Sequence, residues 1–236
     1  QISENALTAV SLAFPAQNLM RAFAGGTAVG FNALLSRSLG EKAQEHVNAT
    51  ANHAVLLWIF NSILFFLIGM TCANVFFKAQ TSDVQIINYG VQYFLIVVGC
   101  SFGLFGQFTF ERLLQSTGRT IHTMITQGLG AIINIILDPI FIFGLFGMPR
   151  LEVAGAALAT IIGQICACLL GIFMNIKFNS DIHINMKKFK FNFQIIKQIY
   201  TVGIPSIIMQ SIGSVMTFGM NLILISFSTT AAAVFG

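Results

Sequence analysis

The sequence has very little charge: Asp, Glu, Lys and Arg make up 8% of its 236 residues, against about 25% in typical globular proteins. Apolar residues account for 56% of the chain, and the mean hydropathy is +0.81. A soluble domain of this size covers its surface with charged side chains, and 12 basic and 8 acidic residues are too few to do so. The scarcity of charge therefore excludes a soluble globular fold and indicates a protein embedded in the lipid bilayer.

The sequence also lacks the patterns of most catalytic and metal sites. Cys166 and Cys168 have neither a second cysteine pair nor a nearby histidine to complete a zinc site. The Ser-x-x-Lys pattern and the P-loop that binds ATP phosphates are absent. The four histidines are scattered along the chain: His46, His53, His122 and His183. We therefore expect no enzyme, no catalytic residues and no cofactor. Nucleic-acid binding is not expected either, because the basic residues lie in loops between apolar stretches.

Six apolar stretches are long enough to cross a bilayer. A helix satisfies its own backbone hydrogen bonds, and about 20 apolar residues span the hydrocarbon core. The stretches are Val10–Ser36, His46–Phe77, Val84–Phe110, Thr120–Pro149, Val153–Ile176 and Gln198–Gly236. The sequence therefore predicts an all-α integral membrane protein with six transmembrane helices. Within them, Gly26-x-x-x-Gly30 and Gly99-x-x-x-Gly103 allow close approach of a second helix.

The basic residues indicate how the helices are oriented. Alternation places the loops at 37–45, 111–119 and 177–197 on one side of the membrane, and these loops hold nine basic residues. The opposite side holds two, Lys78 and Arg150. Because basic loops stay on the cytoplasmic side, the three loops are predicted to be cytoplasmic.

The longest connection, 177–197, combines basic and aromatic residues in the run Lys187-Lys188-Phe189-Lys190-Phe191-Asn192-Phe193. Such a segment suits the cytoplasmic membrane interface. A binding site for RNA or for a calmodulin-like protein is the alternative. The connection is also the best candidate for a boundary between two lobes.

Asp138 is the most informative residue, because it is an acid inside an apolar stretch. A carboxylate in the hydrocarbon is costly and is usually functional, facing the protein interior. Asn134 lies four residues earlier and therefore on the same helix face. Pro139 has no N–H to donate to the Ile135 carbonyl oxygen, which adds a third oxygen suited to a proton, Na⁺ or a cationic substrate. The alternative is an Asp near the outer interface, capped by water or by Arg150.

Thr160 and Gln164, four residues apart on the following helix, are candidates to complete the same polar pocket. Thr160 has the alternative of bonding to its own helix backbone.

Two further groups of polar residues are candidates for substrate binding or gating. Glu111 shares one helix face with Gln107, and a salt bridge from Glu111 to Arg112 or Arg119 is the structural alternative. Arg21 lies about eleven residues into its stretch, where an arginine must pair or reach the interface.

Four segments resemble the multidrug and toxic compound extrusion (MATE) transporter family, and especially its bacterial drug-efflux branch. Their order and spacing match across nearly the whole chain. The segments are Asn32-Ala33-Leu34-Leu35-Ser36-Arg37-Ser38-Leu39-Gly40-Glu41, Glu111-Arg112-Leu113-Leu114-Gln115-Ser116-Thr117-Gly118, Asn134-Ile135-Ile136-Leu137-Asp138-Pro139 and Gly155-Ala156-Ala157-Leu158-Ala159-Thr160.

The resemblance implies a bundle of twelve helices in two six-helix lobes, of which this chain covers about helices two to seven. Residues 1–178 would form most of the N-terminal lobe without its first helix, 179–197 a cytoplasmic linker between lobes, and 198–236 the first helix of the C-terminal lobe. The remainder of the transporter would be its partner. By resemblance, Asn134, Asp138 and Thr160 match positions of a cation site, and Glu111 matches an acidic position of the drug-efflux branch.

The resemblance therefore implies a secondary antiporter of the prokaryotic plasma (inner) membrane. It would export amphipathic, cationic drugs in exchange for H⁺ or Na⁺, with Na⁺ held at Asp138 and Asn134. A lipid-linked saccharide flippase of the wider superfamily is one alternative, although it would need a more basic cavity. A membrane-embedded enzyme would need a paired catalytic group. A third alternative is a segment without transport activity of its own.

Overall fold

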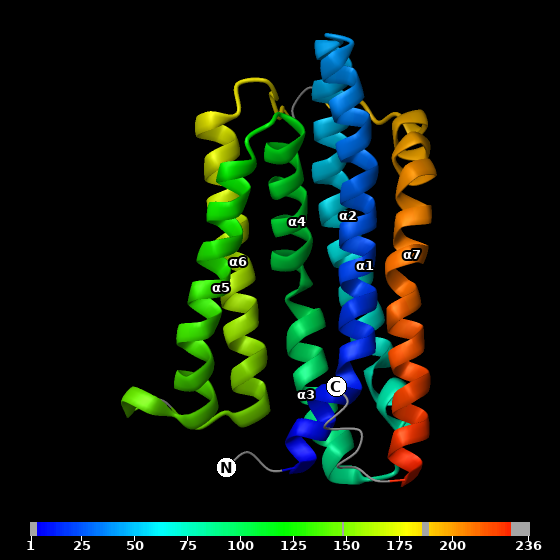
Figure 1. Cartoon of the computed structure of the whole chain (residues 1–236), viewed down its shortest axis with the longest axis vertical. Coiled ribbons are helices and arrows are strands. Elements are labelled where there is room, and N and C mark those ends of the chain that lie inside the picture. The colour runs from blue at the N-terminus through cyan, green and yellow to red at the C-terminus, as the bar shows by residue number, and fades with distance from the viewer. Residues whose placement is uncertain (1–3, 148, 186–188, 228–236) are drawn as a thin grey trace.

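The computed structural model describes residues 4–147, 149–185 and 189–227. Over these residues the chain forms seven α-helices and one short 3₁₀ turn, and no strand. The elements are α1 (Glu4–Gly40), α2 (Gln44–Lys78), α3 (Val84–Gly99), α4 (Ser101–Ser116), α5 (Thr120–Phe143), η1 (Leu145–Gly147), α6 (Glu152–Phe178) and α7 (Phe193–Phe227). Figure 1 shows them side by side in one elongated bundle. The prediction of an all-α membrane protein is confirmed.

Four helices are individually long and apolar enough to cross a membrane: α2, α5, α6 and α7. The pair α3 and α4 passes the same test as one broken span, which gives up to five. The helix α1 has 37 residues but carries polar side chains on its buried face, among them Gln17 and Thr27. These polar groups lower the mean hydropathy of α1 relative to the other long helices, and α1 is not among the helices that pass this test. Its predicted membrane crossing is supported by its length and by its position in the bundle.

The predicted single helix over Val84–Phe110 is wrong in one respect, because it breaks at Cys100. The two halves, α3 and α4, meet at an angle of 43°. Glycines flank the break, and a Cβ at Gly103 would lie 3.1 Å from the Ile165 backbone nitrogen of α6. The Trp58 indole of α2 donates to the Phe102 carbonyl oxygen at 2.9 Å. Packing against α6 and α2 thus stabilises a break that the hydropathy pattern did not indicate.

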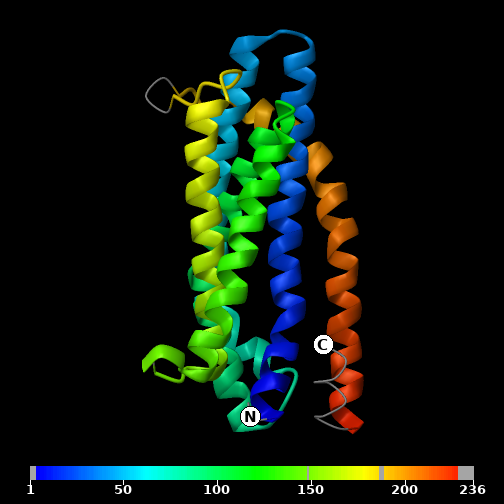
Figure 2. The same cartoon turned by 60° about the vertical axis from the view of Figure 1, so that its left-hand side comes forward.

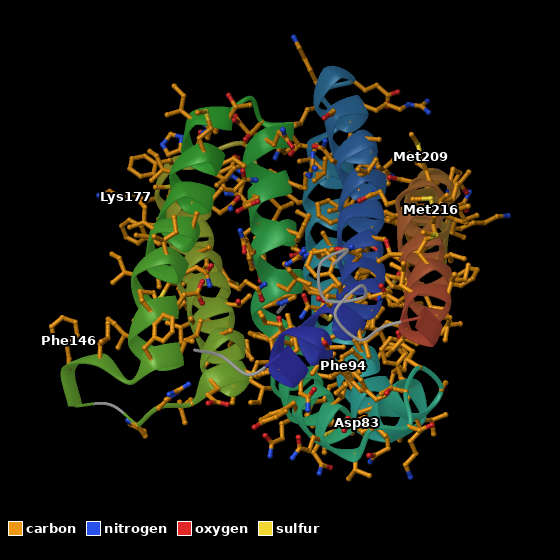
Figure 3. The ribbon with its side chains drawn as sticks, turned by 60° about the horizontal axis from the view of Figure 1, so that its bottom comes forward. Asp83, Phe94, Phe146, Lys177, Met209 and Met216 are labelled. Atoms are coloured by element: carbon orange, nitrogen blue, oxygen red, sulfur yellow. The ribbon has the colours of Figure 1, made fainter. Side chains whose placement is uncertain are left out.

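The stretch predicted to reach Pro149 also ends earlier, since α5 stops at Phe143. Gly144 follows in the left-handed conformation, with φ of 71°, and its N–H returns to the Ile140 carbonyl oxygen. This is a common way to end a helix, because glycine adopts positive φ at little cost. The turn η1 then projects from the bundle, with Phe146 at its tip and 91% exposed (Figure 3).

The helices pack most closely in three pairs: α1 with α7, α5 with α6, and α4 with α6. Gly26 and Gly30 of α1 lie directly against the backbone of α7 at Gly203 and Ile199. Figures 1 and 2 show that the connections α1–α2, α4–α5 and α6–α7 lie at the same end of the bundle. These are the three connections that the sequence analysis singled out as basic. Lys187 and Lys188 of the third connection lie outside the described residues.

The helix α7 begins at Phe193, so the last five residues of the predicted linker, 193–197, are helical.

Asp83 caps the beginning of α3: its carboxylate accepts the backbone N–H groups of Gln85 at 2.8 Å and Ile86 at 3.3 Å. The cap made by Asp83 therefore fixes where α3 begins.

Candidate functional site

Asn134, Asp138 and Thr160 form one polar cluster between α5 and α6. With the amide of Asn134 oriented to satisfy both of its groups, its nitrogen donates to Asp138 Oδ2 and its oxygen accepts the Thr160 backbone N–H, each at 3.2 Å. In the opposite orientation the nitrogen lies 3.5 Å from Asp138 Oδ1 and 3.3 Å from Thr160 Oγ1. Either orientation joins Asn134 to both neighbours, so the three residues lie close together as the sequence analysis expected.

The helix contact that holds the cluster is made by small residues. A Cβ at Gly163 of α6 would lie 2.7 Å from the Gly130 carbonyl oxygen of α5. Because the two backbones approach this closely, Asn134 can reach across to Thr160 on the neighbouring helix. The Thr160 hydroxyl donates to the Ala156 carbonyl oxygen at 2.9 Å, which leaves the lone pairs of its oxygen to accept from or coordinate another group.

Asp138 lies about one turn before the end of α5 and is half-buried. Arg150, the residue that would cap Asp138 in the alternative interpretation, forms a salt bridge with Glu152 at 3.1 Å. The Asp138 carboxylate lies within electrostatic range of the buried Tyr93 side chain of α3.

The cluster offers oxygen atoms of three kinds, from a carboxylate, an amide and a hydroxyl. Hard cations prefer such oxygen ligands, and sites for Na⁺ or H⁺ in transporters are built from similar groups near interrupted helices. Pro139 provides the interruption, because it lies inside α5 and cannot donate to the Ile135 carbonyl oxygen. Within the described residues no three His, Cys, Asp or Glu side chains gather as they would around a transition metal. The donor set thus suits a proton or Na⁺.

Glu111 forms a second polar cluster, between α4 and α5, and is 5% exposed. Its Oε1 accepts from Gln107 Nε2 at 2.9 Å and from Thr126 Oγ1 at 3.4 Å, and its Oε2 accepts from Gln127 Nε2 at 2.9 Å. The Thr123 hydroxyl donates to its backbone carbonyl oxygen at 3.2 Å. A buried carboxylate is thus held by neutral hydrogen-bond donors from two helices.

The salt bridge from Glu111 to Arg112 or Arg119 is not formed. Arg119 instead pairs with Asp181 at 2.5 Å, and Arg112 donates to Gln115 Oε1 at 2.6 Å. The salt bridge is absent because the Glu111 side chain points toward α5, where it meets Gln127. Arg119 lies in the loop before α5 and points toward the end of α6, where it meets Asn179. Gln107 is a direct partner of Glu111, as its spacing of four residues predicted.

The remaining candidates lie apart from these clusters. Gln164 is one turn beyond Thr160, and the described contacts include no hydrogen bond from it to Asn134 or Asp138. Arg21 is exposed, lies 3.5 Å from Asn18 Oδ1 and lines a groove of about 360 Å³ between α1 and α7. Among the described residues it has no carboxylate within salt-bridge distance.

The sequence did not indicate the second helix of the Glu111 cluster or the contacts of Tyr93. Gln127 lies seven residues before Asn134 and thus on the same face of α5, so its spacing could have indicated that it also points inward. Tyr93 is 6% exposed, interacts with the Gln17 side chain and lies within electrostatic range of Arg21. Nothing in the spacing of α3 indicated these contacts, because they join α1 to α3.

One short pattern, Gly99-Cys100-Ser101-Phe102-Gly103, matches the Gly-x-Ser-x-Gly pattern of many hydrolases. Ser101 lies at the α3–α4 break, is 1% exposed and donates to the Ser62 carbonyl oxygen at 3.4 Å. Its described contacts include no histidine or carboxylate, so the geometry of a serine nucleophile with its base is not present there.

Comparison with known proteins identifies the family. A family model described as MatE matches residues 1–140. The multidrug export protein MepA of Staphylococcus haemolyticus is 27% identical over 230 residues, which cover 98% of this chain and 50% of that protein. A MepA of Staphylococcus aureus is 24% identical over the same length. The chain thus spans about half the length of the curated relatives it matches.

Solved structures agree over nearly the whole chain. An inward-facing conformation of a multidrug resistance MATE family transporter of the MOP superfamily superposes with a TM-score of 0.92 and 25% identity, covering 99% of this chain and 52% of that one. An outward-facing conformation of such a transporter gives 0.86 and 26% identity, covering 99% and 51%. These relatives are transporters and export proteins rather than enzymes. The chain therefore belongs to the MatE family, the multidrug and toxic compound extrusion transporters that its motifs resemble.

Proposed function

We propose that the full-length protein is a secondary antiporter that exports amphipathic, cationic compounds in exchange for H⁺ or Na⁺. This chain would supply most of the N-terminal lobe (1–178), the linker (179–197) and the first helix of the C-terminal lobe (198–236). The three basic connections would face the cytoplasm of a prokaryotic cell, consistent with their position at one end of the bundle (Figure 1). The proposal rests on the cluster of Asn134, Asp138 and Thr160.

The coupling would work through the charge of Asp138. An ionised carboxylate facing a poorly solvated interior is costly, and a bound proton or Na⁺ removes that cost. If the ion binds one arrangement of α5 and α6 more tightly than another, and the substrate has the opposite preference, the two fluxes are coupled. The bend allowed by Pro139 provides a place where α5 can change its arrangement.

The flippase alternative receives little support from the geometry. Lipid-linked saccharides carry phosphate, which requires several basic groups in the cavity. Among the described residues, Arg21 is the basic side chain furthest inside an apolar stretch, and it lies in an open groove next to α7.

The test uses the full-length protein in proteoliposomes, loaded with a fluorescent amphipathic cation. Gradients of H⁺ and of Na⁺ are imposed separately. We expect Asp138→Asn to lower gradient-driven efflux at least about tenfold, because the neutral amide keeps the size of the side chain but does not change charge. Asp181→Asn is the matched control, since Asp181 is an exposed acid outside the membrane-spanning helices and is paired with Arg119.

Unchanged efflux and unchanged ion dependence in Asp138→Asn would refute the assignment.

The variants Thr160→Ser and Thr160→Val test whether the Thr160 hydroxyl belongs to the proposed ion site. Serine keeps the hydroxyl oxygen and valine removes it, so only the valine variant should weaken the ion dependence. Equal behaviour of the two variants would remove the Thr160 hydroxyl from the proposed site.

A further inference from the structure

The connection between α6 and α7 lies against the beginning of α2 and is bound there by side chains of that helix. Its described residues are 179–185 and 189–192. Three polar residues spaced by four bond to its backbone at 2.8 to 3.0 Å: Gln44 to the Asp181 carbonyl oxygen, Asn48 to the His183 N–H and Asn52 to the Asn185 N–H. Residues spaced by four share one helix face, so this face of α2 is a continuous docking surface.

His53 directly follows Asn52 on α2, also binds the connection, and is completely buried. Its Nδ1 lies 2.7 Å from the Ala49 carbonyl oxygen, and its Nε2 lies 2.9 Å from the Asn192 backbone nitrogen. A carbonyl oxygen can only accept and a backbone N–H can only donate, so Nδ1 carries the proton and Nε2 is the acceptor. The rings of Phe189 and Phe191 pack on the imidazole, with centroid distances of 4.9 and 6.0 Å. Both ring nitrogens are therefore used.

Asn192 is the residue from which α7 starts. Its side-chain oxygen accepts the Gln194 N–H at 2.9 Å, and its carbonyl oxygen accepts the Ile195 N–H at 3.2 Å. This is the arrangement of a helix N-cap. The residue that caps α7 with its side chain is thus held by His53 of α2 through its backbone N–H.

Further along α7 the helix has a point where it can bend. Pro205 lies inside the helix and cannot donate to the Thr201 carbonyl oxygen. Beyond it, Met209 and Met216 project from the outward face of the helix (Figure 3) and are 77% and 64% exposed. The helix therefore has a tightly held start, followed by a proline at which its direction can change.

We propose that His53 is a positioning residue for transport. Together with Gln44, Asn48 and Asn52 it forms a clasp that holds the start of α7 on α2 while the part of α7 beyond Pro205 changes its arrangement. The clasp acts on geometry, and it makes no contact with a transported compound. The activity part of its test rests on the transport function proposed above, whereas the structural part does not.

The structural part is limited trypsin digestion of the full-length protein, followed by mass spectrometry. Lys190 has an exposed side chain and lies two residues before Asn192. Release of the clasp should free the backbone of this segment, so that trypsin can reach the peptide bond that follows Lys190. His53→Leu removes the acceptor of the Asn192 N–H and should raise the rate of cleavage after Lys190 about fivefold, as expected for the loss of one net hydrogen bond. Cleavage after Lys42, which lies outside the clasp, serves as the internal reference and should not change.

Two matched variants distinguish the hydrogen bond from the bulk of the side chain. His53→Gln places an oxygen near the position of Nε2 and should return the cleavage rate close to that of the parent. His183→Leu is the control, because His183 contributes its backbone N–H and its side chain is exposed. Equal rates for His53→Leu and the parent, or equal rates for His53→Leu and His53→Gln, would overturn the clasp. If His53→Leu does not fold, Asn52→Ala removes one clasp bond and is judged by the same cleavage ratio.

The activity part is efflux measured over a range of substrate concentrations. His53→Leu should lower the maximal rate severalfold while the apparent KM stays within about twofold, since the substrate site is untouched. His53→Gln should restore the rate. Faster cleavage with unchanged transport would overturn the positioning role and leave the proposed function standing. Absence of efflux from the parent would count against the proposed function, and the cleavage result would still decide the clasp.

Discussion

Replacing Gly26 by alanine tests the close contact between α1 and α7. A Cβ at this position would lie 2.8 Å from the Ile207 backbone nitrogen, 3.0 Å from the Gly203 carbonyl oxygen and closer still to the Ile207 side chain. Ordinary contacts of a Cβ begin near 3.4 Å. Two of these neighbours are backbone atoms that cannot rotate away, so the helices must separate by about 0.6 Å to accommodate the methyl group.

The expected cost follows from that separation. Overpacking of a close contact typically costs about 1–3 kcal/mol, while alanine in a helix interior is favoured over glycine by up to about 1 kcal/mol. With the full offset the net loss is about 0–2 kcal/mol, centred on about 1 kcal/mol. Gly213→Ala on α7 is the matched control, because no atom lies within 4 Å of its Cβ position; this variant should be neutral or slightly stabilised.

The measurement is thermal unfolding of the full-length protein in detergent, with intrinsic tryptophan fluorescence as the signal. Gly26→Ala should unfold at a temperature about one to two degrees below the parent, since each kcal/mol shifts the midpoint of a 150–250-residue domain by about 2–4 °C and that of the longer full-length protein by less. Gly30→Ala, whose Cβ would meet the Ile199 carbonyl group, should behave in the same way. An unfolding temperature of Gly26→Ala equal to or above that of Gly213→Ala would refute the reasoning.

Three further predictions concern hydrogen bonds. Glu111→Gln keeps the size of the side chain but turns an amide toward Gln107 and Gln127, so it should lose about 1.5–3 kcal/mol of charge-assisted bonding and lower the unfolding temperature. Asp83→Ala removes the cap of α3, which costs about 1 kcal/mol, and should speed hydrogen exchange of the first amides of that helix about fivefold. Trp58→Phe removes the indole donor to the start of α4 and should lower the unfolding temperature by a few degrees, followed by circular dichroism because the variant lacks the single tryptophan of this chain.

Each of these predictions has its own control. For Glu111, the surface variant Glu41→Gln should have little effect, because its salt bridge with Arg37 is exposed; equal stability of the two variants would contradict the buried network. For Asp83, unchanged exchange at Gln85 and Ile86 would show that the carboxylate does not cap the helix. For Trp58, a variant as stable as the parent would mean that the hydrogen bond across the α3–α4 break contributes nothing.

Much of the molecule is readable from local patterns along the chain. The shortage of charge and the six apolar stretches predict membrane helices, because the bilayer accepts little else. The pairing of Asn134 with Asp138, and of Gln107 with Glu111, follows from a spacing of four residues on one helix. Such features depend on periodicity and on solvent, both of which act on each segment separately.

Contacts between helices depend on how whole surfaces pack, and no spacing within one segment encodes them. Gly26 predicted a close neighbour, but only the folded bundle shows that α7 is that neighbour. In the same way Gln127, and not Arg119, became the partner of Glu111. His53 appeared as one of four scattered histidines, and its position beside Asn192 follows from the return of the chain across the end of α2. The break at Cys100 likewise depends on Trp58 and on the α6 backbone, which lie far away in sequence.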